Sequence, residues 1–177
     1  KVYVANRQLD KAEAMLRRII DLDSSNLEAF NLLGRYLVVR GKLPEARRQF
    51  EELVKKDPRS VSAQTMLGFL AKAQGDTAAA KKAYEAAIRV DPQTPTAANN
   101  LAWLYANTDG GNLDLALQLA QTAHAKIPAS AQITDTLAFV YYKKEMGSFA
   151  VPLLAEALGF HSVEMDDQIL QASGLPN

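Results

Sequence analysis

Two histidines are the side chains of this chain best suited to metal binding or proton transfer. His124 lies among alanines in a segment with helical spacing, and His161 lies in a connecting segment near the C-terminal end. Neither has a second histidine one helical turn away, as a pair of zinc ligands would. A lone histidine is more often structural, so we expect no catalytic residue, no metal and no cofactor.

A glycine-rich segment and four basic pairs could in principle contact phosphate. Residues 109–112 read Asp-Gly-Gly-Asn, but no Lys-Ser or Lys-Thr follows, so the segment is typical of a turn. The basic pairs are interleaved with glutamates, and the i,i+4 spacing of Glu51 with Lys55 and of Glu52 with Lys56 favours intrahelical ion pairs. The pairs are Arg17-Arg18, Arg47-Arg48, Lys55-Lys56 and Lys81-Lys82. We therefore expect no nucleic-acid partner.

The overall composition names no partner and no compartment. Lys plus Arg and Asp plus Glu are 20 each, and cysteine is absent, so the chain has neither a global basic field nor disulfides. No apolar run approaches the ~18 residues of a membrane span, so we expect no direct membrane insertion in this segment. The register places residue 1 within a repeat, and a targeting segment could lie upstream. Cytoplasmic and periplasmic locations both stay open.

The elements that hold these residues follow a period of 34 positions. Gly34 recurs as Gly68, and the same shift relates Ala46 to Ala80, Phe50 to Tyr84 and Pro58 to Pro92. A period of this length is typical of stacked helical hairpins, each of which buries its apolar face against its neighbours. The small residues at the glycine and alanine positions let two helices cross closely. The sequence therefore predicts an all-α solenoid of helix-turn-helix hairpins.

The repeat divides the chain into six segments. They are 1–26 (a partial repeat), 27–60, 61–94, 95–130 with an insertion in its turn, 131–162 in degenerate form, and 163–177 as a capping helix and tail. In the first complete unit the spacing predicts helices over 27–40 and 44–56, with Gly41 ending the first helix. Residues 113–126, 131–144, 148–158 and 163–172 are further predicted helices. In the partial repeat, Tyr3 matches the end of a first helix.

The repeated residues resemble the tetratricopeptide repeat. The motif is read in the first unit as Phe30, Leu33-Gly34, Leu37, Ala46, Phe50, Leu53 and Pro58. It recurs in the second as Leu67-Gly68, Ala71, Ala80, Tyr84, Ala87 and Pro92. This resemblance implies a right-handed superhelix. The closing repeats, from Asn99 and from Asp135, are similar to those of bacterial, in some cases exported, lipoprotein-type repeat proteins.

The resemblance also implies where a partner would bind. In this family the first helix of each unit lines a concave groove, and its fifth, ninth and twelfth positions tend to face that groove. The candidate groove residues are Asn31, Arg35, Thr65, Phe69, Asn99, Trp103, Asp135, Phe139 and Tyr142. The family's carboxylate clamp for chaperone tails needs a basic pair on its third helix, and Asn99 and Trp103 stand there instead.

Two functions from different classes fit these features. The first is a non-catalytic interaction scaffold that binds a peptide or helix of a partner protein in the groove. The second is an architectural spacer or self-assembly segment of a longer protein, with no groove ligand. Self-association is expected through the N-terminal face, which carries Val2, Tyr3, Val4, Leu9 and a stripe at Leu16 and Ile19.

Overall fold

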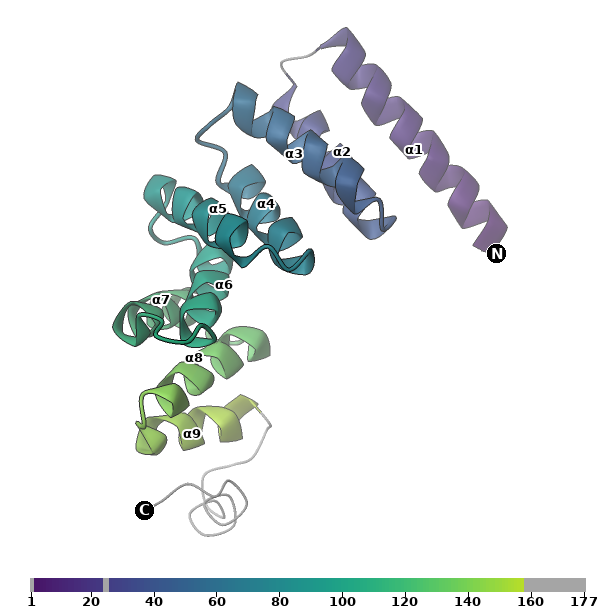
Figure 1. The fold of residues 1–177 in the computed structure, drawn as a ribbon. Coiled ribbons are helices and arrows are strands. Elements are labelled where there is room, and N and C mark those ends of the chain that lie inside the picture. The colour runs from purple at the N-terminus through teal and green to yellow at the C-terminus, as the bar shows by residue number, and fades with distance from the viewer. Residues whose placement is uncertain (1, 24–25, 158–177) are drawn as a thin grey trace. The chain divides into compact units, whose positions relative to one another are not determined.

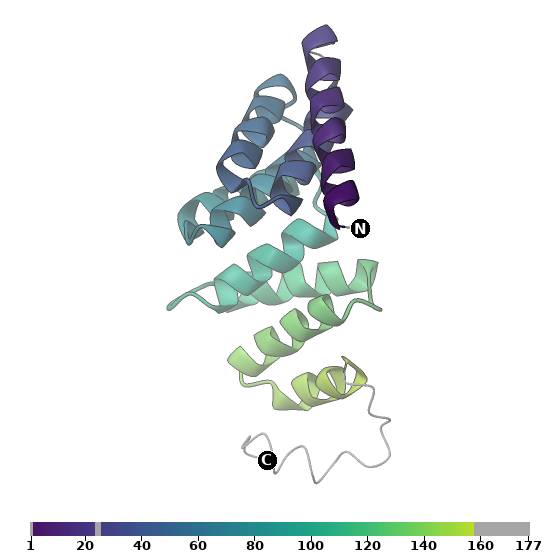
Figure 2. The same cartoon turned by 90° about the vertical axis from the view of Figure 1, so that its right-hand side faces the viewer.

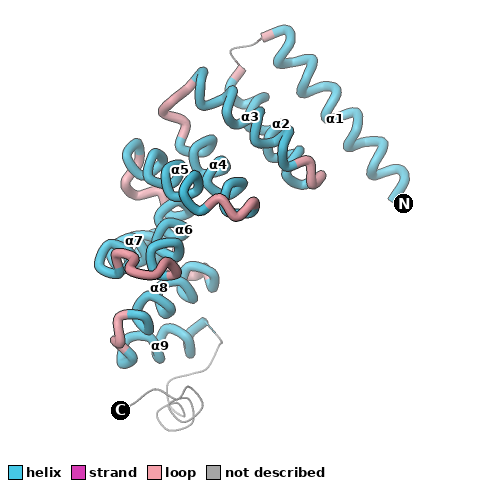
Figure 3. Tube along the Cα trace, viewed as in Figure 1, coloured by secondary structure: helices cyan, strands magenta, loops and turns pink. Residues whose placement is uncertain are grey.

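The computed structural model describes residues 2–23 and 26–157, and every regular element among them is a helix (Figure 1; Figure 3). The chain divides into two compact units, residues 1–90 and 91–177, which are described one at a time. The first holds α1 (Val2–Leu22), α2 (Leu27–Val39), α3 (Leu43–Lys56), α4 (Val61–Ala73) and α5 (Thr77–Val90). The second holds α6 (Pro95–Ala106), α7 (Leu113–Lys126), α8 (Ala131–Lys143) and α9 (Gly147–Ala157). The all-α solenoid of helical hairpins is confirmed.

Sequential helices pack in pairs within each unit. In the first unit α2 packs on α3 and α4 on α5, and the pairs are joined by packing of α3 on α4 and of α1 on α2. In the second unit the pairs are α6 with α7 and α8 with α9, joined through α7 and α6 against α8 (Figure 2). Each hairpin therefore covers an apolar face of the next, as the period predicts. The segment boundaries between repeats stay a prediction.

Caps and glycines set the ends of the helices. The Oδ1 atoms of Asn26, Asp76 and Asn112 accept hydrogen bonds from backbone N–H groups three residues ahead, at 3.0, 3.0 and 2.9 Å. Gly41 and Gly75 follow α2 and α4 with φ of +71° and +77°. This left-handed conformation stops a helix and suits glycine, which has no Cβ. The described helices in the ranges predicted from spacing begin and end within one residue of those ranges.

An aromatic ring lies directly on a glycine where the two helices of each hairpin cross, in α2–α3 and in α4–α5. A Cβ at Gly34 would lie 2.6 Å from Phe50 Cζ, and a Cβ at Gly68 would lie 2.5 Å from Tyr84 Cε1. Both rings are fully buried. The Tyr84 hydroxyl has no hydrogen-bond partner among the described residues, and burial raises the pKa of this phenol. Each ring therefore packs at the crossing of two helices, in the space left by the glycine of that hairpin.

The connection between α6 and α7 is longer than the others and is built on two glycines. Gly110 has a φ of +68°, and a Cβ at Gly111 would lie 1.9 Å from the carbonyl oxygen of Tyr105. The Thr108 hydroxyl donates a hydrogen bond of 2.7 Å to the Leu104 carbonyl. The glycine-rich segment is therefore a turn, as its sequence predicts, and it leaves α6 and α7 packed as a hairpin.

Two features of the chain depart from a strict reading of the repeat. α1 is one continuous helix, whereas the register places the end of one helix at Tyr3 and the start of another after it. Arg7 stands where Gly41 and Gly75 end the later helices, so no glycine interrupts α1. In the second unit Glu145 has a φ of 58°, and Gly147 begins α9. The predicted capping helix over 163–172 lies outside the described residues.

The glycine crossings lead to a first prediction, on stability. We expect Gly68→Ala to lower the free energy of unfolding by about 1–3 kcal/mol, although alanine normally favours a helix by about 1 kcal/mol over glycine. The added Cβ has no room because the Tyr84 ring is fully buried. Urea denaturation followed by circular dichroism measures the change. In the Tyr84→Leu background the same substitution should lower the free energy of unfolding by less. An equal decrease in both backgrounds would show that the Tyr84 ring is not what excludes the added Cβ.

The left-handed residue before α9 leads to a second prediction. We expect Glu145→Gly to raise the free energy of unfolding by about 1 kcal/mol, because an L-residue with a side chain is strained at positive φ. Gly75→Glu, the reverse exchange at the equivalent turn of the first unit, should lower it by a similar amount. Thermal melts of both variants test this pair. A lower melting temperature for Glu145→Gly would contradict the prediction, because it would show that contacts of the Glu145 side chain stabilise the fold by more than the strained backbone destabilises it.

Candidate functional site

In the first unit two of the four candidate groove residues are exposed. Arg35 and Phe69 are exposed, and Phe69 is 45% accessible, which is high for a phenylalanine on a packed helix. Asn31 is half-buried, and its Oδ1 accepts a hydrogen bond of 3.1 Å from the Ser62 hydroxyl. Thr65 is also half-buried, and its buried hydroxyl oxygen has no hydrogen-bond partner in the described part of the chain. The polar positions therefore contribute to the packing of α2 and α4, while the ninth positions face solvent.

In the second unit the candidates are distributed in the same mixed way. Asp135 and Tyr142 on α8 are exposed, the tyrosine by 52%. Phe139 is half-buried, and Lys143 Nζ lies over its ring at 5.7 Å from the centroid. Trp103 on α6 is half-buried as well. These residues leave an acidic group and aromatic faces accessible along α8.

The burial of Asn99 differs from the expectation of a row of polar side chains that faces the groove. It is only 4% exposed, and its Oδ1 atom has no hydrogen-bond partner among the described residues. The cause lies in α6, which is buried on nearly every side because it packs against both α7 and α8. A buried, unpartnered carbonyl oxygen costs stability unless it is satisfied. Asn99 is therefore not available to a peptide on the surface of this conformation.

One residue of each basic pair forms an ion pair within its own helix, but in α3 the partners differ from those that the spacing predicts. Lys55 Nζ lies 2.6 Å from Glu52, and Arg47 Nε lies 2.9 Å from Glu51, whereas the expected pairs were Glu51 with Lys55 and Glu52 with Lys56. Lys56 instead lies over the Phe30 ring, 5.3 Å from its centroid. The two expected pairs do not form because other residues of α3 itself compete for them: Arg47 pairs with Glu51, and Glu52 pairs with Lys55. The surface nevertheless alternates in charge.

One carboxylate joins α1 to the α2–α3 hairpin. Glu13 accepts a hydrogen bond of 2.8 Å from Arg17 and one of 3.1 Å from Lys42, and Arg17 also reaches Glu45 at 3.2 Å. The hydrogen bond from Arg17 and the charge of Lys42 hold the pKa of Glu13 below its usual range. The cluster is a structural link, because each of its charges already has a partner.

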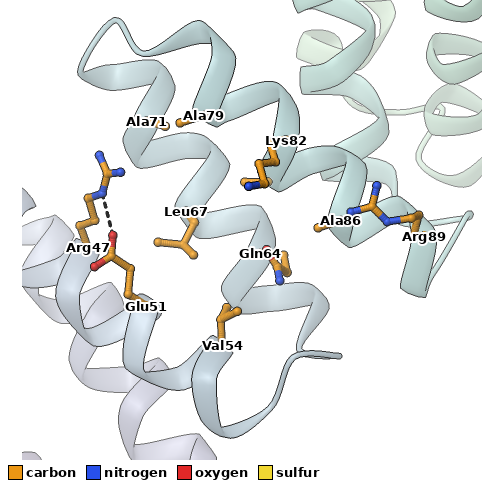
Figure 4. A pocket seen from close by; sticks show the side chains of 11 residues that line it. Arg47, Glu51, Val54, Gln64, Leu67, Ala71, Ala79, Lys82, Ala86 and Arg89 are labelled. Carbon is orange, nitrogen blue, oxygen red and sulfur yellow. Dashed lines mark hydrogen bonds and ion pairs between the residues drawn. The ribbon is translucent and has the colours of Figure 1, made fainter.

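A cavity of about 410 Å³ lies on a surface of the first unit that the groove candidates do not include. α3 and α5 form its two sides and α4 forms its floor (Figure 4). The floor and walls are mainly apolar, and the charged groups lie at the rim. The lining residues are Arg47, Glu51, Val54, Gln64, Leu67, Ala71, Ala79, Lys82, Ala83, Ala86 and Arg89. We call this the α3–α5 cavity.

Alanines on α5 keep the α3–α5 cavity open. Ala79, Ala83 and Ala86 stand at i, i+4 and i+7, so they share one side of the helix and present methyl groups where larger side chains would fill the space. At the rim, Arg47 is paired with Glu51, whereas Lys82 and Arg89 make no ion pair with a described residue (Figure 4). Reasoning from sequence missed this site, although the alanine spacing was visible.

The described residues offer no metal site, and His124 is set among helices. Residues 2–23 and 26–157 hold no group of three or more histidine, cysteine, aspartate or glutamate side chains that could bind an ion. His124 is half-buried on α7, and its buried Nε2 atom has no hydrogen-bond partner among residues 2–23 and 26–157. His161 lies outside the described residues.

Within the described part of the chain, none of the helices is both long enough and apolar enough to span a bilayer.

Comparison with known proteins matches the repeat. The profile described as tetratricopeptide repeat matches residues 1–61, 31–70 and 65–131, which together span more than half of the chain. A search of curated proteins found no match.

Solved structures share the fold at low sequence identity. A crystal structure of the MamA protein is 21% identical in sequence to this chain. The match covers 88% of this chain and 84% of the MamA chain, and the TM-score is 0.69. Residues 41 to the end of MamA from Desulfovibrio magneticus are 18% identical, with coverages of 92% and 91% and a TM-score of 0.70. YrrB, described as a repeat protein of this type with an unusual peptide-binding site, is 22% identical, with coverages of 98% and 88% and a TM-score of 0.69.

Proposed function

This chain belongs to the tetratricopeptide repeat family, and from that premise we propose that it is a non-catalytic scaffold that binds a peptide or helix of a partner protein. The observation that carries the proposal is the exposure of Phe69 and Tyr142 on the first helices of their hairpins. Stiff aromatic side chains left in solvent supply large contact area at a small entropic cost, which makes them frequent binding hot spots.

Each compact unit offers its own contact surface. In the first unit Phe69 and the cation of Arg35 are exposed on α4 and α2, and in the second Tyr142 and the carboxylate of Asp135 are exposed on α8. In each unit the exposed aromatic ring can bind an apolar side chain of a partner, and the exposed charge can pair with an opposite charge on that partner. The description of YrrB as peptide-binding supports the same kind of ligand for this fold.

The absence of a catalytic role is part of the proposal. The family generally serves as an interaction module, and His124 belongs to no group of three or more metal-binding side chains among the described residues. The rival proposal is an architectural spacer, in which the exposed aromatics have no ligand. The two proposals differ in one measurable property, which is the presence of a peptide ligand whose affinity depends on the exposed aromatics.

The third prediction tests this property. We expect a peptide selected by phage display against the full chain to lose about 2 kcal/mol of binding free energy on Phe69→Ala, measured by fluorescence anisotropy. Ile127→Ala is the matched control, because Ile127 is 42% exposed against 45% for Phe69 and lies at the end of α7. Thermal melts of both variants should change little.

The outcomes separate the two proposals. Failure to enrich any peptide, or equal affinity for the Phe69→Ala and Ile127→Ala variants, would reject the scaffold proposal for this surface and favour the spacer. A large fall in the melting temperature of Phe69→Ala would instead show that Phe69 contributes to the packing of the first unit. The same series on Trp103→Ala tests the second unit, where half-burial predicts a larger effect on stability.

We further propose that the N-terminal helix contributes a contact between two copies of the chain. Met15, Ile19 and Leu22 stand at i, i+4 and i+7 on one side of α1, and their exposures are 66%, 39% and 79%. The expected stripe at Leu16 and Ile19 is divided, because Leu16 packs against the core of the first unit. The side chains of Val2, Tyr3, Val4 and Leu9 lie outside the described residues.

A fourth prediction follows for the solution state. We expect Met15→Glu combined with Leu22→Glu to abolish a concentration-dependent dimer seen by sedimentation equilibrium, because two added charges oppose burial of this face. Val39→Glu serves as the control, since Val39 is 82% exposed at the end of α2. A monomeric wild-type chain, or a dimer that survives the double substitution, would reject this contact.

A further inference from the structure

The α3–α5 cavity is a second concave apolar surface, distinct from the groove candidates. On α4 its floor uses Gln64, Leu67 and Ala71, whereas the groove candidates of that helix are Thr65 and Phe69. Because successive helical residues are about 100° apart, the centres of these two sets differ by about 150° around the helix. The two surfaces therefore lie on nearly opposite sides of α4, and a ligand of one leaves the other free.

The charges at the rim indicate the chemistry of an occupant. The cavity lining holds three cations and one carboxylate, and Glu51 already neutralises Arg47, which also donates to the Gln74 side chain at 2.9 Å. Lys82 and Arg89 are exposed and make no ion pair with a described residue. These two cations give the cavity rim a local positive charge, which complements an anionic ligand.

The spacing and the floor favour a peptide over a nucleic acid. Lys82 and Arg89 are seven residues apart on one side of α5, which separates them by about 10 Å along the helix axis. Two acidic side chains seven positions apart on a partner helix have the same separation. The cavity lining is mainly apolar and holds no aromatic ring on which a base could stack. A phosphate backbone would gain only two uncompensated cations here.

We infer that the α3–α5 cavity binds an acidic amphipathic helix of a partner protein. Apolar side chains of that helix enter the space above Leu67 and beside Ala83 and Ala86, and its carboxylates pair with Lys82 and Arg89 at the rim. This is helix-in-groove recognition, in which anchors at i, i+3, i+4 and i+7 contact the groove. The Gln64 side chain at the edge of the floor can donate to or accept from polar atoms of the ligand.

The test uses a designed peptide, since the natural ligand is unidentified. The probe is a fluorescein-labelled helical peptide of about 16 residues, with two glutamates seven positions apart flanking leucines on the same side. Anisotropy is measured with the full chain, and we expect saturable binding that weakens as salt is raised. The same peptide with lysine in place of glutamate should bind at least about tenfold more weakly.

Three variants of the protein assign the site. Lys82→Glu with Arg89→Glu should weaken binding at least about tenfold, whereas Arg48→Glu with Arg59→Glu makes the same change in net charge away from the cavity and should have little effect. Ala86→Leu fills the cavity without changing charge and should weaken binding to a similar extent. Circular dichroism melts confirm that each variant is folded.

Four results would overturn the proposal. They are no saturable binding of the glutamate peptide, equal binding by the two charge-reversal pairs, loss of binding on Phe69→Ala, and tighter binding of a labelled oligothymidine than of the peptide. The Phe69→Ala result would place the peptide on the opposite side of α4 and so support the groove of the proposed function. The oligothymidine result would assign the rim to a phosphate backbone instead.

Discussion

The contact of an aromatic ring with a glycine at the hairpin crossing is the constraint on which the first unit depends. The ring of Phe50 occupies the space that a side chain at Gly34 would need, and Tyr84 does the same at Gly68. Close approach of the two helices buries the apolar faces around each crossing. It also fixes which sides of α2 and α4 remain for solvent. The exposure of Phe69, one residue after Gly68, is a direct result, because neighbours on a helix point in different directions.

The second unit reaches the same hairpin arrangement with smaller residues. Ala102 and Ala138 take the place of the glycine, and Ala120 takes the place of the ring, and all three are fully buried. Less side-chain volume at the crossing is accompanied by more burial of α6 as a whole. That burial includes Asn99, whose amide oxygen is left without a partner among the described residues. The departure from the repeat motif therefore changes which polar positions are available on the surface.

Most of the fold could be predicted because its determinants are local. The glycines that follow α2 and α4 and the capping side chains act within a few residues of the helix ends, and the period repeats this pattern along the chain, so the positions of the helices followed from the sequence. The left-handed conformation of Glu145 and the continuity of α1 were not predicted from the sequence. At both places, whether the chain turns depends on the packing of the flanking helices. Local signals were absent at these two places.

The candidate site was less accessible to sequence reasoning. Phe69 and Tyr142 are exposed, whereas Trp103 and Phe139 are half-buried, and the place of these residues in a groove stays a prediction. The burial of Asn99 and the hydrogen bond from Ser62 to Asn31 depend on packing between helices. The ion pairs of α3 were misassigned for a different reason, because each glutamate of the expected pairs has more than one opposite charge about one turn away on the same helix. The α3–α5 cavity was missed because a row of alanines indicates close packing as readily as empty space. The position of the adjacent helix α3 decides between them.

The packing of each helix on its sequence neighbours also has a kinetic consequence. Within either unit, the principal helix contacts join elements that follow one another along the chain, or that are separated by a single helix. Such contacts close short loops, so little chain entropy is lost before each is formed, and proteins of low contact order fold rapidly. Nascent hairpins of this chain can therefore acquire native contacts during synthesis, before the more distal part of the same unit has left the ribosome.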